Sequence, residues 1–416
     1  MKRRVVVTGM GVITPVGNNV KQFWNSLKEG RSGAGRIQSF DPDDFSTQIA
    51  CEIKDFDPLG YFDRKEAKRT DRYTQFAFAA AKEAMKQSLF ESDKYLDDEQ
   101  FGVIIGSGVG GISTFEKQHS IFMKKGPKRV SPFFITMMIS DIAAGQIAIK
   151  YGLKGPNYAI TSACASAGHA IGDGLMHILS GSSDRMMVGG AEAPITPISI
   201  AGFCSNRAMS QLNEHPQKAS RPFDANRDGF VMGEGSGILI LEELESAKKR
   251  GAKIFAEVAG FAATADAFHI TAPPENGDGA YRVMKNALEM ADIDPTKVDY
   301  INTHGTSTPV GDIAEINAIK NLFPHSLDRL KVNSTKSMTG HLLGAAAGIE
   351  SIASIMSINE NKVHPTINIE NLDPDAEGID FVIGDKAVDH QVDVALCNSF
   401  GFGGHNSSIV FKTFNG

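Results

Sequence analysis

Two stretches of this sequence match each other without a gap: Thr161-Ser-Ala-Cys164-Ala-Ser-Ala-Gly168-His169-Ala-Ile-Gly172 and Asn333-Ser-Thr-Lys336-Ser-Met-Thr-Gly340-His341-Leu-Leu-Gly344. The first serine, the Gly-His pair and the later glycine coincide. The match sets Cys164 and Lys336 at equivalent positions. It indicates that the architecture of the chain is duplicated.

The expected order of secondary structure also recurs around the two stretches. A helix over 76–87 precedes an apolar strand over 101–107, and a helix over 280–290 precedes a strand over 298–306. Each half then ends in a further strand, at 237–241 and 408–411. Because continuous Val/Ile/Leu strands that alternate with helices form sheets buried on both faces, we expect two layered α/β halves.

A restart of the pattern suggests where the halves join. The strand expected over 254–258 resembles the strand over 5–8, and it follows a charged run at 242–250. We therefore expect an N-terminal half over 1–253 and a C-terminal half over 254–416.

Composition indicates an ordinary globular protein. The 416 residues are 42% hydrophobic and carry a net charge of −7, which gives no general footprint for nucleic acid. The apolar start at Val5 is interrupted by Thr8 and Gly9, which favours a buried strand over a secretion signal. No apolar run approaches the length of a membrane span. We expect a cytoplasmic protein that does not act at a membrane.

The four cysteines show no close pairing and no CxxC spacing, so neither disulfides nor a zinc site is expected. The stretch from Gly106 to Gly111 matches GxGxxG, but no acidic strand end follows as ribose recognition requires. The run from Asp224 to Gly229 resembles half of a calcium loop, yet its twelfth position is Gly235. We expect no cofactor and no metal.

Cys164 is the candidate nucleophile. It follows an apolar strand at 158–161 and precedes a helix that opens with small residues. Backbone N–H groups at a helix N-terminus favour a thiolate, and small neighbours leave room for a substrate. A free cysteine flanked by alanine is also common as a buried small hydrophobe, and this segment alone leaves that alternative open.

Two histidines are candidates to work with the cysteine. His304 follows the strand residues 300–303, and His341 follows Gly340 in the second repeat stretch. Both are expected at repeat-equivalent sheet edges near a pseudo-twofold axis. Their paired placement indicates a pocket between the halves in which one nucleophile and two imidazoles converge.

Four ordered motifs carry a resemblance to a known family: Ser162-Ala-Cys164, His304-Gly-Thr-Ser-Thr308, Lys336-Ser-Met-Thr-Gly340-His341-Leu-Leu-Gly344 and Asn398-Ser-Phe-Gly-Phe402-Gly-Gly404. Together they resemble the elongating β-ketoacyl-[acyl-carrier-protein] synthases, and the likeness covers essentially the whole chain. The segments Pro273-Pro-Glu-Asn-Gly277 and Arg227-Asp-Gly-Phe230 are closer to synthase II than to synthase I.

The resemblance implies a thiolase-like fold in an α-β-α-β-α arrangement, a homodimer and a decarboxylating Claisen condensation in fatty acid elongation. Cys164 would hold an acyl chain as a thioester, and malonyl-acyl-carrier protein would lose carbon dioxide. His304 and His341 would donate Nε2–H groups to the enolate. By analogy, the backbone N–H groups of Cys164 and Phe402 form the oxyanion hole.

The resemblance also implies supporting roles for residues around the catalytic three. Lys336 supplies electrostatic support and is expected to pair with Glu350. Thr306 and Thr308 resemble pantetheine-binding hydroxyls, and Phe402 resembles a gate over the acyl pocket. That pocket is expected to be lined by Val109, Phe203 and the partner subunit's Phe134. Acyl carrier protein is the expected partner, in contact with Lys65, Lys68, Arg69, Lys128, Arg129 and Arg207.

Four alternatives differ in their expected residues. A degradative thiolase needs a second cysteine as acid and base where this chain has Gly401 to Gly404 followed by His405. An initiating synthase usually has asparagine where His341 stands, and a non-catalytic chain-length subunit should lack Cys164. A polyketide ketosynthase shares the chemistry and stays open, as does the preferred acyl chain length.

Overall fold

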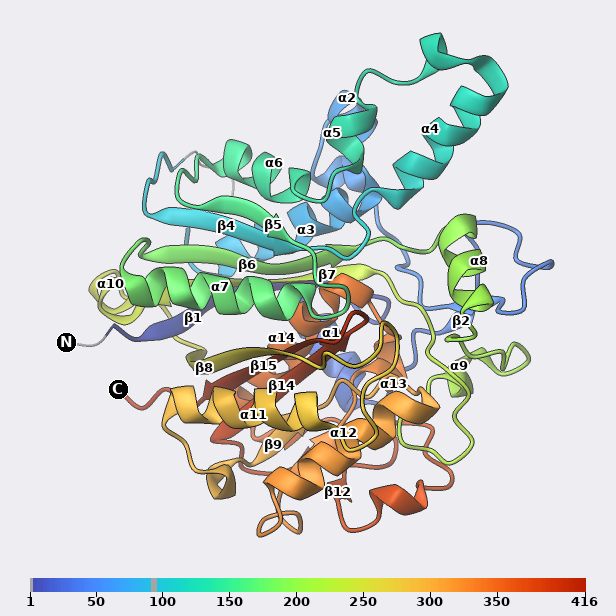
Figure 1. Cartoon of the computed structure of the whole chain (residues 1–416). Helices are drawn as coiled ribbons and strands as arrows, with labels where there is room; N and C mark the ends of the chain where they lie inside the picture. Colours follow the sequence, from blue (N-terminus) through green and yellow to red (C-terminus); the bar gives the residue numbers. More distant parts are fainter. Residues whose placement is uncertain (1–2, 91–95) are drawn as a thin grey trace.

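The computed structural model describes residues 3–90 and 96–416. In this part of the chain, eleven strands form one continuous sheet in the order β12-β10-β9-β14-β15-β8-β1-β7-β6-β4-β5 (Figure 1). The N-terminal half supplies β1 (Val5–Ile13), β4 (Phe101–Gly106), β5 (Asn157–Ile160), β6 (Arg185–Glu192) and β7 (Gly235–Glu243). The C-terminal half supplies β8 (Ala256–Ala265), β9 (Tyr300–Asn302), β10 (Lys331–Asn333), β12 (Asp380–Phe381), β14 (Val394–Gly401) and β15 (His405–Lys412).

The two halves of the sheet have the same topology. The order β5-β4-β6-β7-β1 corresponds strand for strand to β10-β9-β14-β15-β8. In each half the first three strands of that order are parallel and the last two pair antiparallel. The duplication expected from the repeat stretches is confirmed.

The halves meet along a short seam in the sheet. Strands β1 and β8 pair antiparallel over two positions, Val6 with Glu257 and Val7 with Ala256. The helix α10 (Leu244–Lys249) ends shortly before β8 begins. Strand β8 begins at Ala256, two residues later than the strand expected over 254–258. We propose 253/254 as the boundary between the halves.

Helices form three further layers (Figure 1). In the middle, α7 (Ser166–Ser180) and α14 (Ala346–Glu360) contact strands of both half-sheets and each other. The outer faces carry α3 (Arg72–Gln87) and α6 (Ile142–Tyr151) on one side and α11 (Asp278–Ala291) and α12 (Pro309–Leu322) on the other. The result is the expected α-β-α-β-α arrangement.

The middle layer packs so closely that side chains are excluded at one point. A Cβ atom on Gly237 of β7 would lie 2.4 Å from the carbonyl carbon of Gly348 on α14. Such a separation is well inside van der Waals contact, so only glycine allows β7 and α14 to approach this far. The backbones of the N-terminal sheet and a C-terminal helix are thereby in direct contact.

The remaining elements lie at the ends and edges of these layers. They are α1 (Val20–Lys28), β2 (Gly35–Arg36), β3 (Ile49–Ala50), α2 (Arg64–Ala67), α4 (Ile112–Lys125), α5 (Phe134–Met138), α8 (Pro197–Ser205), α9 (Pro216–Ala219), α13 (Lys336–Thr339), β11 (Lys362–Val363) and β13 (Val388–Asp389). Helices α2, α4 and α5 project together beyond the N-terminal half-sheet (Figure 1). Among the described residues, no helix combines the length and apolarity that a membrane crossing requires.

Candidate active site

Cys164 lies in a tight turn between β5 and α7. The preceding Ala163 has φ +50°, a left-handed conformation that costs energy for a residue with a side chain. The Ser166 hydroxyl holds the turn, because it accepts from the Ser162 N–H at 2.9 Å and donates to the Ala163 carbonyl at 2.6 Å. A strained strand-to-helix turn of this kind also carries the nucleophile in other enzymes.

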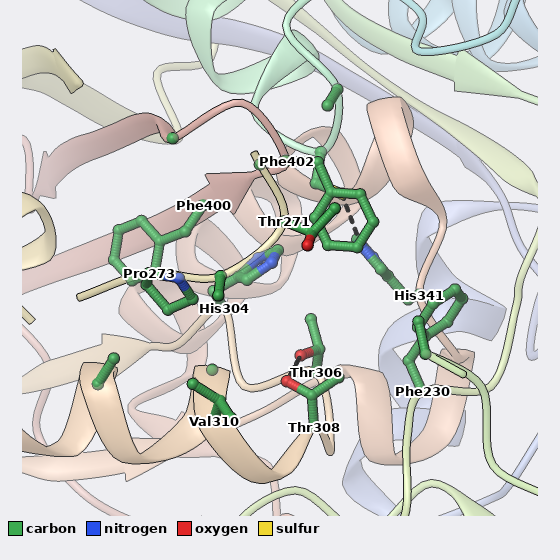
Figure 2. A pocket seen from close by; sticks show the side chains of 18 of the residues that line it. Phe230, Thr271, Pro273, His304, Thr306, Thr308, Val310, His341, Phe400 and Phe402 are labelled. Carbon is green, nitrogen blue, oxygen red and sulfur yellow. Dashed lines mark hydrogen bonds between the residues drawn. The ribbon is translucent and has the colours of Figure 1, made fainter. Parts of the chain in front are cut away.

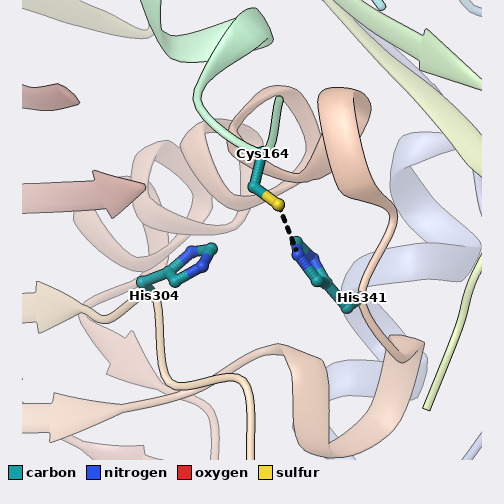
Figure 3. Close-up of side chains that lie close together, drawn as sticks. All are labelled: Cys164, His304 and His341. Carbon is teal, nitrogen blue, oxygen red and sulfur yellow. Dashed lines mark hydrogen bonds between the residues drawn. The ribbon is translucent and has the colours of Figure 1, made fainter. Parts of the chain in front are cut away.

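His341 is the imidazole nearest to the sulfur. Its Nε2 lies 3.0 Å from Sγ of Cys164 (Figure 3). Its backbone N–H donates to the Val231 carbonyl at 2.7 Å, and its carbonyl accepts from the Gly233 N–H at 2.9 Å. His341 follows the short helix α13 and not a regular strand of the sheet, so the expectation that it lies at a strand end is wrong.

His304 completes the group. Its ring centroid lies 5.2 Å from that of His341, with the rings at 86° (Figure 3). One potential ligand or donor atom from each of Cys164, His304 and His341 lies within 4.8 Å of the others. The three side chains named from the sequence therefore converge, and they come from opposite halves of the chain.

The strand that leads to His304 is shorter than expected. It ends at Asn302 and not at Thr306, because the backbone leaves the sheet to bond to a buried carboxylate. The N–H groups of His304 and Gly305 each donate to Glu315 at 2.9 Å, and the Asn398 amide donates to Glu315 at 3.2 Å. Glu315 was not identified from the sequence, since a glutamate within a helix is usually solvated.

Burial decides the protonation states of the site. It raises the pKa of Cys164 to about 12, although Lys336 and the N–H groups of Phe402 and Cys164 act in the opposite direction. Desolvation of the sulfur thus outweighs the helix N-terminus, which is the opposite of the thiolate preference expected from the sequence. Burial, together with Lys336, holds the pKa of both His304 and His341 well below the usual range. Both imidazoles are neutral.

Lys336 forms the expected ion pair. Its Nζ lies 2.5 Å from Oε1 of Glu350, and both side chains are 1% exposed. Because the cation is buried, its field is little screened by water and reaches the catalytic group. Lys336 lowers the pKa of Cys164, His304 and His341 alike.

The backbone N–H groups that were expected from the sequence to form the oxyanion hole lie near the sulfur of Cys164. The backbone N–H groups of Phe402 and of Cys164 itself lie close enough to Sγ to lower the pKa of the thiol. Phe402 lies in the turn between β14 and β15, where Gly403 has φ +88° and Gly404 has φ +73°. The turn conformation that presents the Phe402 N–H thus depends on glycine at the next two positions.

A cavity of about 420 Å³ opens onto the catalytic group (Figure 2). The Thr306 and Thr308 hydroxyls face each other at 2.9 Å on its wall. Val109 and Phe203 also line it, while Phe134 lies on α5 and is not among the described residues that line the cavity of its own chain. Phe400, which the sequence analysis did not single out, packs with its ring centroid 5.7 Å from that of His304.

The basic residues expected at a partner surface are exposed. Lys65, Lys68 and Arg69 lie on and just after α2, and Lys128 and Arg129 lie in the turn after α4. The Arg69 guanidinium stacks over the ring of Phe133, which follows the turn that carries Lys128 and Arg129, at 4.1 Å. Arg207 lies apart from them, at the wall of the cavity.

Glu192 is a second buried carboxylate that the sequence analysis missed. It accepts from the N–H groups of Gly108, Val109 and Gly344 and from the Ser107 hydroxyl, at 2.6 to 3.2 Å. It thus ties the loop that carries Val109 to the segment that follows His341. The one indication of Glu192 in the sequence was its position as an acidic residue at the end of an apolar strand.

The Glu192→Ala variant is expected to be strongly destabilised. It leaves four donors without an acceptor, and two of these, the Ser107 hydroxyl and the Gly344 N–H, are buried. Each buried donor without a partner costs about 1 to 3 kcal/mol, so we expect a loss of at least about 2 kcal/mol. Chemical denaturation measures this. The exposed Glu214→Ala is the matched control and should change the free energy of unfolding by less than about 0.5 kcal/mol. Equal effects for the two variants would contradict the role of Glu192.

Comparison with protein families agrees with this site. Residues 2–247 match the model of the β-ketoacyl synthase N-terminal domain, and residues 255–370 match that of the C-terminal domain. The chain belongs to the β-ketoacyl synthase family. The gap between the two matches contains the proposed boundary between the halves of this synthase.

Individual relatives cover the whole synthase. It is 51% identical over 413 residues to 3-oxoacyl-[acyl-carrier-protein] synthase 2 of Synechocystis sp., with 99% of both chains covered. A β-ketoacyl synthase from Burkholderia phymatum has a TM-score of 0.93 at 33% identity, covering 99% of this chain and 100% of that one. A ketosynthase solved in complex with its type II polyketide acyl carrier protein is similar at 37% identity, with a TM-score of 0.91 and full coverage of both chains.

The thiolase alternative also has a structural test. Cys397, the remaining cysteine near the C-terminal loop, is buried on β14 and contacts the Ser351 hydroxyl at 3.8 Å. It is not among the described residues that line the cavity. The synthase has no cysteine in the place where a thiolase needs its second one.

Proposed function

We propose that Cys164 takes an acyl chain from acyl carrier protein and that His304 and His341 promote its condensation with malonyl-acyl-carrier protein. The convergence of these three side chains at the end of one cavity carries the proposal. The enzyme is a condensing acyltransferase of fatty acid elongation, a β-ketoacyl-[acyl-carrier-protein] synthase of type II. Its product is the 3-oxoacyl-acyl-carrier protein.

Acyl transfer begins at the sulfur. Sγ attacks the thioester carbonyl, and the negative charge that develops on the carbonyl oxygen is stabilised by the N–H groups of Cys164 and Phe402. The thiol proton goes to the departing pantetheine sulfur. With its proton on Nε2, His341 donates to Sγ at 3.0 Å and stabilises the charge on sulfur while that proton leaves.

Condensation uses the two imidazoles as neutral donors. The carbonyl oxygen of the malonyl thioester accepts from Nε2–H of His304 and of His341. The bond between the carboxylate and the malonyl carbon breaks, carbon dioxide leaves, and the electron pair of that bond forms the enolate. The enolate carbon then attacks the acyl thioester on Cys164. The sulfur departs as a thiolate and takes up a proton from solvent. Because burial and Lys336 keep both imidazoles uncharged, they stabilise the enolate without protonating its carbon.

The cavity provides places for the remaining parts of the substrate. Thr306 and Thr308 present hydroxyls that would bind the pantetheine amides. Val109 and Phe203 supply apolar wall for the acyl chain. Phe402 also lines the cavity, with its ring centroid 6.5 Å from that of Phe203.

Phe402→Ala is expected to relax the discrimination among acyl primers. The side chain is 37% exposed, so the substitution should cost much less stability than the roughly 3 to 5 kcal/mol of a truncated core aromatic. Pre-steady-state acylation rates with primers of different length measure the effect. Unchanged discrimination together with a large loss of stability would show that Phe402 is a packing residue.

The neighbouring glycine offers a companion variant. A Cβ atom on Gly403 would lie 2.8 Å from Nε2 of His405, and its φ of +88° disfavours any side chain. Gly403→Ala is therefore expected to slow acylation of Cys164. Wild-type acylation rates in this variant would contradict a moving loop.

Acyl carrier protein is the proposed partner, and the exposed basic residues near α2 and after α4 support it. Carrier proteins that present an acidic surface would be attracted to such a patch. Glutamate substitution of Lys65 and Arg69 is expected to raise KM for carrier-bound substrates. Reaction with a free pantetheine thioester should not change, and an equal loss with both substrates would contradict docking at this patch.

We also propose a homodimer, with the partner subunit's Phe134 completing the acyl pocket. Strand β5 is the end of the sheet and pairs with β4 alone among the described strands, so its other edge is open to a second copy. Sedimentation velocity tests this, and a monomer at assay concentration would contradict it. The four unpaired cysteines support a reducing compartment, and we place the enzyme in the cytoplasm.

A reconstituted reaction tests the function. The enzyme, saturated acyl-carrier proteins and malonyl-acyl-carrier protein are expected to give a 3-oxoacyl product two carbons longer, observed by mass spectrometry. Repeated extension without reduction, giving poly-β-keto chains, would instead support the polyketide alternative.

A further inference from the structure

The catalytic group also has the composition of a zinc site. Zn²⁺ in proteins binds cysteine sulfur and histidine nitrogen, and three protein ligands with one open position form its usual reactive site. Here Sγ of Cys164 and ring nitrogens of His304 and His341 lie within 4.8 Å of one another. Ligand distances of about 2.3 Å to sulfur and 2.0 to 2.1 Å to nitrogen require ligands roughly 3.4 to 3.6 Å apart in a tetrahedral site. Nε2 of His341 already lies 3.0 Å from Sγ, and side-chain rotations must close the other separations, which are at most 4.8 Å.

The ligands are held before any metal arrives. His341 is fixed by hydrogen bonds of its backbone to Val231 and Gly233, and the backbone N–H of His304 is fixed by Glu315. Cys164 is fixed by the strained turn after Ala163. Since the backbones that carry the ligands are already ordered, ion binding has to order only the side chains.

The neighbouring charges permit a dication. The field of Lys336 at the site opposes an ion, and its ion pair with Glu350 at 2.5 Å offsets part of that repulsion. The Cys164 thiol loses its proton to solvent on binding and adds one negative charge. Water entering through the cavity can occupy the fourth position.

We propose that Zn²⁺ binds the acyl-free enzyme at Cys164, His304 and His341 and inhibits it reversibly. The ion is an inhibitor and plays no part in condensation, because it occupies the sulfur and both enolate donors. A thioester on Cys164 removes the thiolate ligand. Zinc binding and acylation therefore exclude each other, and an acyl-loaded enzyme resists the metal.

Cobalt(II) gives a test that needs no turnover. The purified, acyl-free enzyme is titrated with Co²⁺ and its absorption spectrum recorded. We expect one Co²⁺ per chain, with a sulfur-to-metal charge-transfer band and the intense visible bands of a tetrahedral ion. Added Zn²⁺ should abolish them. The bands should be absent from Cys164→Ala, at least about tenfold harder to saturate in His304→Ala and His341→Ala, and absent from acylated wild-type enzyme.

Cys204→Ser is the matched control, since Cys204 is the other partly buried thiol and does not line the cavity. This variant should keep the spectrum. Bands that persist in Cys164→Ala or vanish in Cys204→Ser would overturn the proposal, as would a spectrum without a thiolate band. Thermal melting shows whether each variant is folded, and His304→Ala repeats the test should Cys164→Ala be unfolded.

Activity gives an independent measurement. Condensation should be inhibited by Zn²⁺ and fully restored by a chelator, and preacylation should protect the enzyme. Inhibition that a chelator does not reverse would indicate oxidation or precipitation and would overturn the proposal. Because the cobalt spectrum is recorded without substrate, failure of metal binding is distinguishable from failure of the condensing function.

Discussion

The Cys164→Ala variant is expected to lose acyl transfer and condensation completely while it remains folded. The substitution removes a single sulfur atom from a turn of small residues, so it leaves little cavity, but it removes the atom that forms the thioester. Intact-protein mass spectrometry after incubation with acyl-carrier protein measures the loss. Wild-type enzyme should gain one acyl mass per chain, and the variant should gain none.

Peptide mapping locates the acyl group in the wild-type enzyme. Cys51 and Cys397 are buried, and Cys204 is partly buried outside the cavity, so none of them is expected to react. Cys204→Ser is the matched control and should acylate normally. An acyl group found on any cysteine other than Cys164 would refute the assignment.

The second large effect is expected at the imidazoles. His304→Ala and His341→Ala should each lower the rate of malonyl decarboxylation by about a hundredfold or more, the usual result of removing one donor to a developing oxyanion. Acylation of Cys164 should fall less, because its oxyanion is stabilised by the N–H groups of Phe402 and Cys164. Release of carbon dioxide and the rate of acylation are measured separately.

His325→Ala is a matched control for these variants, since His325 is exposed and is not among the described residues that line the cavity. It should leave both rates unchanged. Decarboxylation at the wild-type rate in both His304→Ala and His341→Ala would exclude the proposed donors. A loss of acylation as large as the loss of decarboxylation would instead indicate a collapsed site.

The parts of the fold that recur in the sequence were predictable. The repeat around Cys164 and Lys336 and the spacing of apolar strands led to two equivalent halves, and the observed strand orders match. Cys164, His304 and His341, which were named from the sequence for their chemistry, also converge. They come from opposite halves of the chain, and the two halves meet at the site. The pairing of Lys336 with Glu350 was expected from the resemblance to the family.

Local geometry was harder to predict where tertiary contacts override a pattern. The sequence predicts one continuous strand to Thr306, but the N–H groups of His304 and Gly305 donate to Glu315 on α12 and not to a neighbouring strand. The pKa of Cys164 depends on how completely water is excluded, which spacing alone does not reveal. Glu192 and Glu315 were missed because a carboxylate whose partners are backbone groups leaves no motif.

The direct contact between Gly237 and Gly348 connects the packing of the core to the geometry of the catalytic group. A larger residue at either position would push α14 away from β7, and α14 begins only a few residues after His341. Sγ of Cys164 belongs to one half and Nε2 of His341 to the other, so their 3.0 Å separation would lengthen with that displacement. The packing of β7 against α14 therefore sets the distance between Cys164 and His341. A mutation in this core can be selected against although it lies far from any substrate, because it changes that distance.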